Sequence, residues 1–183
     1  MYYILIFSIF FTNSLAQVII FEEPKLNPMK NFNKPEYAGP WYDIARIPNI
    51  FEVGQKCSVF DYKFDKHDGS FNIDLLSKSK ITGNSRNLTG AARPRENEPS
   101  SVLNLYYPDF LKIGVLTVLD TDYKNYAVVT TVSSVIGSIK LQMAWIWSRE
   151  PTLSPEYYQL AEDVLRVNDI SPDKLKLSDQ CDC

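Results

Sequence analysis

The sequence predicts an all-β protein, an eight-stranded antiparallel up-and-down β-barrel with one C-terminal α-helix packed outside. Apolar and polar residues alternate over short runs with a period of two, which is typical of half-buried strands. Turn signals interrupt these runs at intervals of about ten residues. A single pattern of helical period follows the last run. Eight antiparallel strands joined by short turns close into a barrel with room for one small ligand.

The first 16 residues are predicted to be a signal peptide. Residues 4–11 form an apolar run too short to span a bilayer, and Ser14 and Ala16 supply the small residues that precede a signal-peptidase cut. Residues 17–183 then form one domain, which begins with an extended arm over residues 17–38. The protein is therefore expected to be secreted and extracellular.

Eight expected strands follow the arm. They cover residues 41–47, 58–64, 71–75, 88–92, 103–107, 113–120, 126–132 and 139–149. Asp68-Gly69 forms the hairpin turn between the second and third strands. In the last strand Arg149 follows Trp145 and Trp147 in the same phase, so the arginine is expected to point where the tryptophans point.

Residues 154–168 are predicted to form the helix, and residues 169–183 a C-terminal tail. Ser154 can cap the helix and Pro155 suits its first position. The apolar stripe has helical spacing and consists of Tyr157, Leu160, Ala161, Val164 and Leu165. We expect this stripe to pack against the outer wall of the barrel.

Composition excludes several classes of protein. With 45% hydrophobic residues and a net charge of −3, the chain is neither disordered nor a nucleic-acid-binding protein. Its single histidine, His67, would have to carry any zinc, haem or serine-triad chemistry alone. We therefore expect no catalytic residue and no metal site, so the protein is predicted not to be an enzyme.

In a secreted protein, the three cysteines are candidates for disulfide bonds. Cys57 can pair with Cys181 or with Cys183, and spacing does not decide between them. Asn87-Leu88-Thr89 is the only glycosylation sequon, and Asn87 is expected on an exposed loop or strand edge.

Three separated motifs carry a family resemblance: a GxW motif, a TDY turn and a final arginine. Their residues are Gly39, Trp41, Thr121, Asp122, Tyr123 and Arg149. In this order on an eight-strand pattern they resemble the lipocalin family, and longer stretches resemble its apolipoprotein D-like branch, which includes insect bilin-binding proteins and insecticyanins. The resemblance implies that Trp41 plugs the closed end of the barrel and that Arg149 stacks over it. These residues are thus expected to be structural.

Ligand binding is expected inside the barrel, above the plug. Candidate residues come from the inward phase of the strands and from matches to family pocket positions. They are Phe60, Tyr62, Phe71, Ile73, Leu75, Leu103, Leu105, Tyr107, Leu116, Met143, Trp145 and Trp147. The resemblance implies a carrier of a small hydrophobic ligand, either a bilin such as biliverdin or a lipid, sterol, retinoid or fatty acid. No cofactor is required; a bound biliverdin-type chromophore is one candidate.

Two alternatives stay open. The barrel can be filled by its own side chains, so that the protein acts through its surface, or a pocket cysteine can make it an isomerase. At the open end, Ile50 and Phe51 are candidates for a peripheral membrane or receptor contact. The oligomeric state is left open as well.

Overall fold

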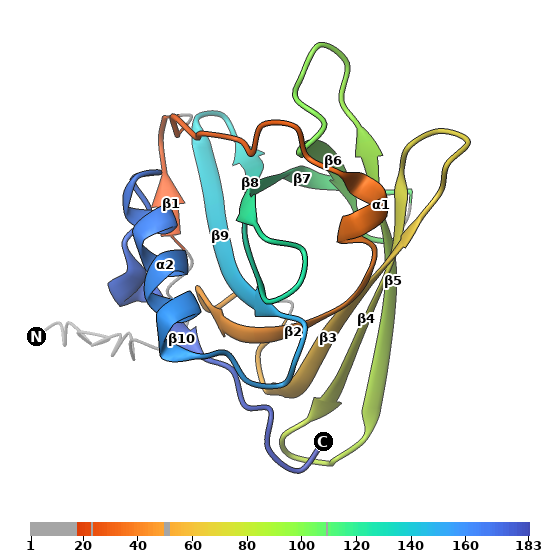
Figure 1. Cartoon of the computed structure of the whole chain (residues 1–183), viewed down its shortest axis with the longest axis vertical. Coiled ribbons are helices and arrows are strands. Elements are labelled where there is room, and N and C mark those ends of the chain that lie inside the picture. Colours follow the sequence, from red (N-terminus) through yellow and green to blue (C-terminus); the bar gives the residue numbers. More distant parts are fainter. Residues whose placement is uncertain (1–17, 23, 50–51, 109) are drawn as a thin grey trace, which may run out of the picture.

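The computed structural model describes residues 18–22, 24–49, 52–108 and 110–183. It forms a closed antiparallel barrel with a helix outside, which confirms the predicted fold class (Figure 1). The barrel strands are β2 (Gly39–Arg46), β3 (Gln55–Phe64), β4 (Phe71–Ser79), β5 (Ser85–Pro94), β6 (Val102–Tyr106), β7 (Lys112–Thr121), β8 (Tyr126–Ile136) and β9 (Ile139–Ser148). Each strand pairs with the next, and β9 pairs back onto β2 to close the barrel. The predicted signal peptide lies outside the described residues.

Short elements flank the barrel. Strand β1 (Val18–Ile20) pairs with β9, and β10 (Lys176–Leu177) pairs with β2. A short helix, α1 (Lys34–Tyr37), interrupts the arm that was predicted to be extended. The reason is local: the Asn33 side chain accepts a hydrogen bond from the Glu36 amide and caps the helix, and Pro35 stands in its first turn.

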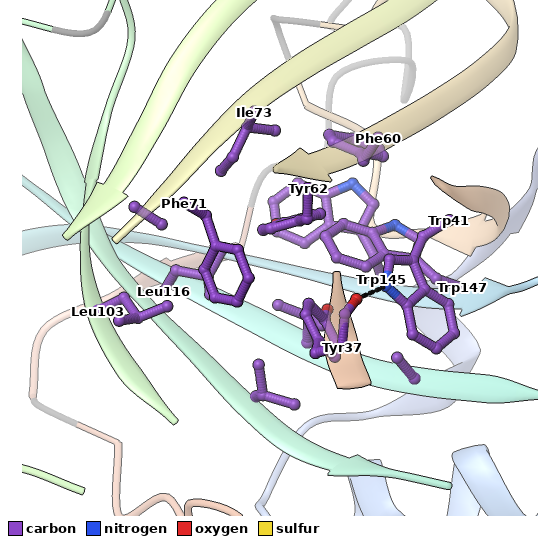
Figure 2. Packing of buried hydrophobic residues seen from close by; sticks show 14 of the residues in the cluster. Tyr37, Trp41, Phe60, Tyr62, Phe71, Ile73, Leu103, Leu116, Trp145 and Trp147 are labelled. Carbon is purple, nitrogen blue, oxygen red and sulfur yellow. Dashed lines mark hydrogen bonds between the residues drawn. The ribbon is translucent and has the colours of Figure 1, made fainter. Parts of the chain in front are cut away.

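The inward faces of the strands form one aromatic-rich core. Phe60, Tyr62 and Phe71 are almost fully buried there, and Figure 2 shows them with Trp145 and Trp147 in the barrel interior. In β7, alternation places Val118 in this core and Leu119 in the outer one, and the register shifts between Val118 and Asp120. A register shift of this kind hides the inward face of an apolar strand from sequence periodicity.

Arg149 closes the base of the barrel. Its guanidinium carbon lies 3.7 Å from the centroid of the Trp41 ring, and Trp41 is fully buried. The same guanidinium donates to the backbone carbonyls of Glu36, Tyr37, Ala38, Pro40 and Tyr123 at 2.9–3.1 Å. Gly39 has φ +101°, and a Cβ there would lie 3.3 Å from Arg149 Nη1, so the motif glycine leaves room for the arginine.

The TDY turn supplies one of those carbonyls and is itself held by Asp122. The Asp122 carboxylate accepts hydrogen bonds from the backbone amides of Lys124, Asn125 and Tyr126 and from the Asn125 side chain. Burial alone would raise the pKa of Asp122, but these hydrogen bonds outweigh it and hold the pKa below its usual value. The turn therefore has an architectural role at the closed end.

Helix α2 (Pro155–Arg166) lies outside the barrel (Figure 1), where it contacts β7 and β8. Ser154 caps its N-terminus as predicted. Ala161 and Leu165 are fully buried against an outer apolar cluster that includes Ile146. Leu160 departs from the predicted stripe, because its side chain is 43% exposed. The buried stripe is thus narrower than the sequence period indicated.

The C-terminal tail completes the wall between β2 and β3. The β2–β3 pairing ends at Tyr42 and Val59. Beyond that point the Gln180 side chain donates to the carbonyls of Asp43 and Ser58, one on each strand, at 2.9 Å. The chain then ends in a disulfide between Cys57 and Cys183, which decides the pairing that spacing left open; Cys181 is an exposed free thiol.

We predict that Arg149→Lys destabilises the fold by about 2–4 kcal/mol, because an ammonium cannot stack on Trp41 and serve five carbonyls in the plane of a guanidinium. Urea unfolding followed by tryptophan fluorescence measures the effect. Arg166→Lys, at an exposed site on α2, is the matched control and should change stability by less than about 0.5 kcal/mol. Equal effects of the two variants would contradict the role assigned to Arg149.

We also predict that Cys57→Ser lowers the stability of the oxidised protein by about 3–5 kcal/mol, because the disulfide closes a sequence separation of 126 residues. Cys181→Ser should change stability by less than about 0.5 kcal/mol. Urea unfolding and non-reducing peptide mapping provide the measurement. Recovery of a peptide that links Cys57 to Cys181 would show the pairing to be wrong.

Candidate ligand-binding site

A cavity lies inside the barrel toward its open end. It is lined by Asn49, Glu52, Phe60, Tyr62, Leu75, Leu88, Leu105, Tyr107, Ile113, Leu116, Thr131, Met143, Trp145 and Trp147. The space free of atoms is about 490 Å³ when the open mouth is counted, but only about 40 Å³ admits the centre of a water molecule. The cavity is therefore a narrow crevice between side chains, with room for roughly three waters.

Nine of the twelve predicted ligand-binding residues line this cavity. They are Phe60, Tyr62, Leu75, Leu105, Tyr107, Leu116, Met143, Trp145 and Trp147. Phe71, Ile73 and Leu103 are buried in the same core but do not line the cavity. Each lies nearer the closed end than the lining residue of its own strand, which is Leu75 on β4 and Leu105 on β6.

Five lining residues were not among the predicted set. Leu88 and Ile113 are apolar strand residues whose depth in the barrel depends on the stagger of the strands. Thr131 is a polar residue on an inward face. Asn49 and Glu52 belong to the segment between β2 and β3, and only the course of that segment brings them over the cavity. The sequence placed this segment at the open end, but gave no sign that these two side chains face the cavity.

Aromatic rings form one side of the cavity. The ring of Trp147 stacks on Phe60 with centroids 4.6 Å apart, and it lies 5.7 Å from Tyr62 and 6.0 Å from Trp145. Tyr37, below this group, contacts Tyr62 edge-on and accepts a hydrogen bond from Trp41 at its carbonyl (Figure 2). The ring stack thus joins the cavity directly to the plug at the closed end.

A buried charge cluster adjoins the cavity. Glu52 is 3% exposed, and its Oε2 accepts hydrogen bonds from Asn49 Nδ2 at 2.5 Å and from Trp145 Nε1 at 3.0 Å. Arg46 forms an ion pair with the fully buried Asp43, and its Nη1 lies 3.7 Å from Glu52 Oε1. One guanidinium therefore faces two buried carboxylates.

The pKa of Asp43 reflects the excess of two buried carboxylates over one guanidinium. Burial, and then repulsion by Glu52, raises the pKa of Asp43 to about 7, although Arg46 and the hydroxyl of Ser178 favour the charged carboxylate. Ser178 donates to Asp43 Oδ2 at 2.7 Å and accepts from Arg46 at 2.8 Å. The C-terminal tail is thereby coupled to the charge cluster beside the cavity.

Four lining residues carry buried polar atoms that have no hydrogen-bond partner among the described residues. The atoms are Glu52 Oε1, Tyr107 Oη, Thr131 Oγ1 and Trp147 Nε1. Burial raises the pKa of Tyr107, and the charges of Glu52 and Asp74 raise it further, so its hydroxyl stays protonated at neutral pH. The apolar crevice thus contains both a potential acceptor and potential donors.

The cysteines and other predicted features lie elsewhere. Cys57 is bonded to Cys183, so within the described chain no free thiol lines the cavity. The described residues include no cluster of His, Cys, Asp and Glu side chains that could hold a metal. They also contain no helix that is long and apolar enough to cross a membrane.

The predicted glycosylation site, Asn87, is exposed on β5. Ile50 and Phe51 lie outside the described residues.

Comparison with known proteins agrees with this architecture. A family model described as a lipocalin-like domain matches residues 32–180. Apolipoprotein D of Bos taurus is 32% identical over 155 residues, which cover 84% of this chain and 80% of that protein. Insecticyanin-A of Manduca sexta is 27% identical over 151 residues, covering 79% and 77%. The crystal structure of lobster apocrustacyanin A1 is 25% identical and superimposes with a TM-score of 0.70, covering 81% and 79%. The chain belongs to the lipocalin family.

Proposed function

We propose that the protein is a secreted carrier that binds a small hydrophobic ligand inside its barrel without chemical conversion. The observation that carries this proposal is the cavity at the open end, whose lining is almost entirely aliphatic and aromatic. Apolar lining with a few polar groups is typical of ligand sites. The disulfide and the apolar run at the N-terminus support secretion.

Biliverdin fits the cavity poorly in the conformation described. A linear tetrapyrrole is far larger than the space of about 40 Å³ that admits the centre of a water molecule. Its entry would require the rings of Phe60, Tyr62 and Trp147 to move apart, and those rings are closely stacked. A single-chain lipid or a retinoid also exceeds this space. Because its cross-section is smaller than that of a bilin, its entry would require less displacement of these rings, so a slim ligand is favoured over a bilin.

The narrow interior also favours one alternative, a filled barrel that acts through its surface. This alternative and the carrier proposal differ in whether any apolar molecule enters the barrel. The isomerase alternative has less support, because Cys57 is bonded to Cys183 and the free thiol of Cys181 is exposed rather than at the cavity. We therefore propose a binding protein rather than an enzyme.

A membrane or receptor contact at the open end stays a prediction for Ile50 and Phe51. Described residues of the same end support it. The side chains of Val53, Ile81 and Phe110 are 54%, 91% and 78% exposed, and they belong to three separate loops around the mouth. Exposed apolar side chains at the open end that contact a membrane or a receptor would bring the cavity close to a source of apolar ligand.

We predict that the protein binds the neutral fluorophore N-phenylnaphthylamine and that Leu105→Trp weakens this binding by about tenfold or more. Leu105 is 5% exposed and lines the cavity, so an indole at this position takes up the space needed by a ligand. Fluorescence titration measures binding, and near-ultraviolet circular dichroism verifies folding. Met143→Phe, a milder replacement in the same cavity, serves if Leu105→Trp does not fold.

The matched control is Leu160→Trp, which adds the same ring on the outer face of α2 and should leave binding unchanged. Failure of the wild-type protein to bind any apolar fluorophore would favour the filled barrel. Unchanged binding by both cavity variants would place the site elsewhere.

A further inference from the structure

Glu52 is the one charged side chain among the described residues that line the cavity. Its Oε2 is fully engaged by Asn49 and Trp145. Its Oε1 accepts no hydrogen bond from the described residues, and the nearest cation, Arg46 Nη1, lies 3.7 Å away, beyond hydrogen-bond distance. A buried carboxylate oxygen without a donor is unfavourable. A ligand that supplies a donor at this position would therefore gain binding free energy.

Three other lining residues also carry buried polar atoms without a partner among the described residues. Tyr107 and Thr131 carry hydroxyls, which can donate or accept, and the Trp147 indole can only donate. The cavity therefore offers donors as well as the acceptor Glu52 Oε1, so a ligand with polar groups can form hydrogen bonds in it. A hydroxyl has both capacities, whereas a hydrocarbon has neither.

A ligand carboxylate suits this cavity badly. It would bring a second negative charge next to Glu52 in a site with little water, and Arg46 is already shared between Glu52 and Asp43. Lys80 and Lys176 line a separate recess and not the cavity, so neither lysine is available to a carboxylate there.

We propose that Glu52 is the polar anchor of the ligand, that its Oε1 accepts a hydrogen bond from a hydroxyl or amine, and that the cavity thereby selects neutral or cationic lipophilic molecules against carboxylates. This inference rests on the proposed carrier function and narrows its ligand class. It disfavours fatty acids and also bilins, whose side chains carry carboxylates.

Three ligands that differ only in the polar head test the selectivity. Hexadecylamine, hexadecanol and hexadecanoate, each below its micellar concentration at neutral pH, compete with N-phenylnaphthylamine for the wild-type protein. The amine and the alcohol are expected to displace the fluorophore at concentrations about tenfold lower than hexadecanoate, a difference of about 1.4 kcal/mol. The shared chain length keeps the apolar contribution constant.

The variant Glu52→Gln then tests the residue. The amide keeps an oxygen for Asn49 and Trp145 but removes the charge and replaces Oε1 with a donor. Affinity for hexadecylamine should fall by about tenfold, and affinity for hexadecanoate should rise by a similar factor. Glu96→Gln makes the same change in charge at an exposed position between β5 and β6 and should leave all three affinities unchanged.

The outcomes separate this inference from the carrier function. If the fluorophore and all three ligands fail to bind, the carrier function itself is wrong. If the fluorophore binds and the three head groups bind equally, or hexadecanoate binds best, the carrier function stands and the anchor is refuted. If Glu52→Gln does not fold, the wild-type series decides the selectivity. Tyr107→Phe then shows whether the selectivity survives while Glu52 keeps its charge, as the anchor requires.

Discussion

The guanidinium of Arg149 on the ring of Trp41 is the interaction on which the rest of the barrel depends. One side chain from the end of β9 satisfies carbonyls of α1, of β2 and of the TDY turn. It thereby joins β2, β9 and a turn that are far apart in the sequence. Because this planar cation both stacks and donates, it closes the base of the barrel without a second layer of structure.

Closure at one end determines where binding can occur. The aromatic rings stack upward from Tyr37 and Trp41 through Tyr62 to Trp147, so the lower half of the interior is filled. Free space remains only above this stack, and the segment between β2 and β3 delivers Glu52 to it. The plug, the cavity and its charged lining are thus parts of one continuous packing arrangement rather than independent sites.

The C-terminal tail also links parts of the chain that are far apart in the sequence, at the wall between β2 and β3. The β2–β3 pairing stops early, and the side chain of Gln180 bridges the two strands beyond that point. Ser178, on the same tail, bonds both Asp43 and Arg46. The segment that carries Cys183 therefore also supports the buried charges next to the cavity, so the disulfide holds in place a wall that the binding site uses.

Local pattern was sufficient for the strands and the helix, because side-chain alternation and capping are properties of neighbouring residues in the chain. The separation of plug residues from cavity residues rested on the family resemblance instead. Tertiary structure alone could decide three other points. The stagger of the strands sets the depth of each inward residue, which placed Phe71 and Leu103 below the cavity and Leu88 in it. The course of the tail selected Cys183 over Cys181. The path of the segment between β2 and β3 brought the Glu52 carboxylate within 3.0 Å of the indole nitrogen of Trp145, 93 positions away in the sequence, and no local periodicity encodes such a contact.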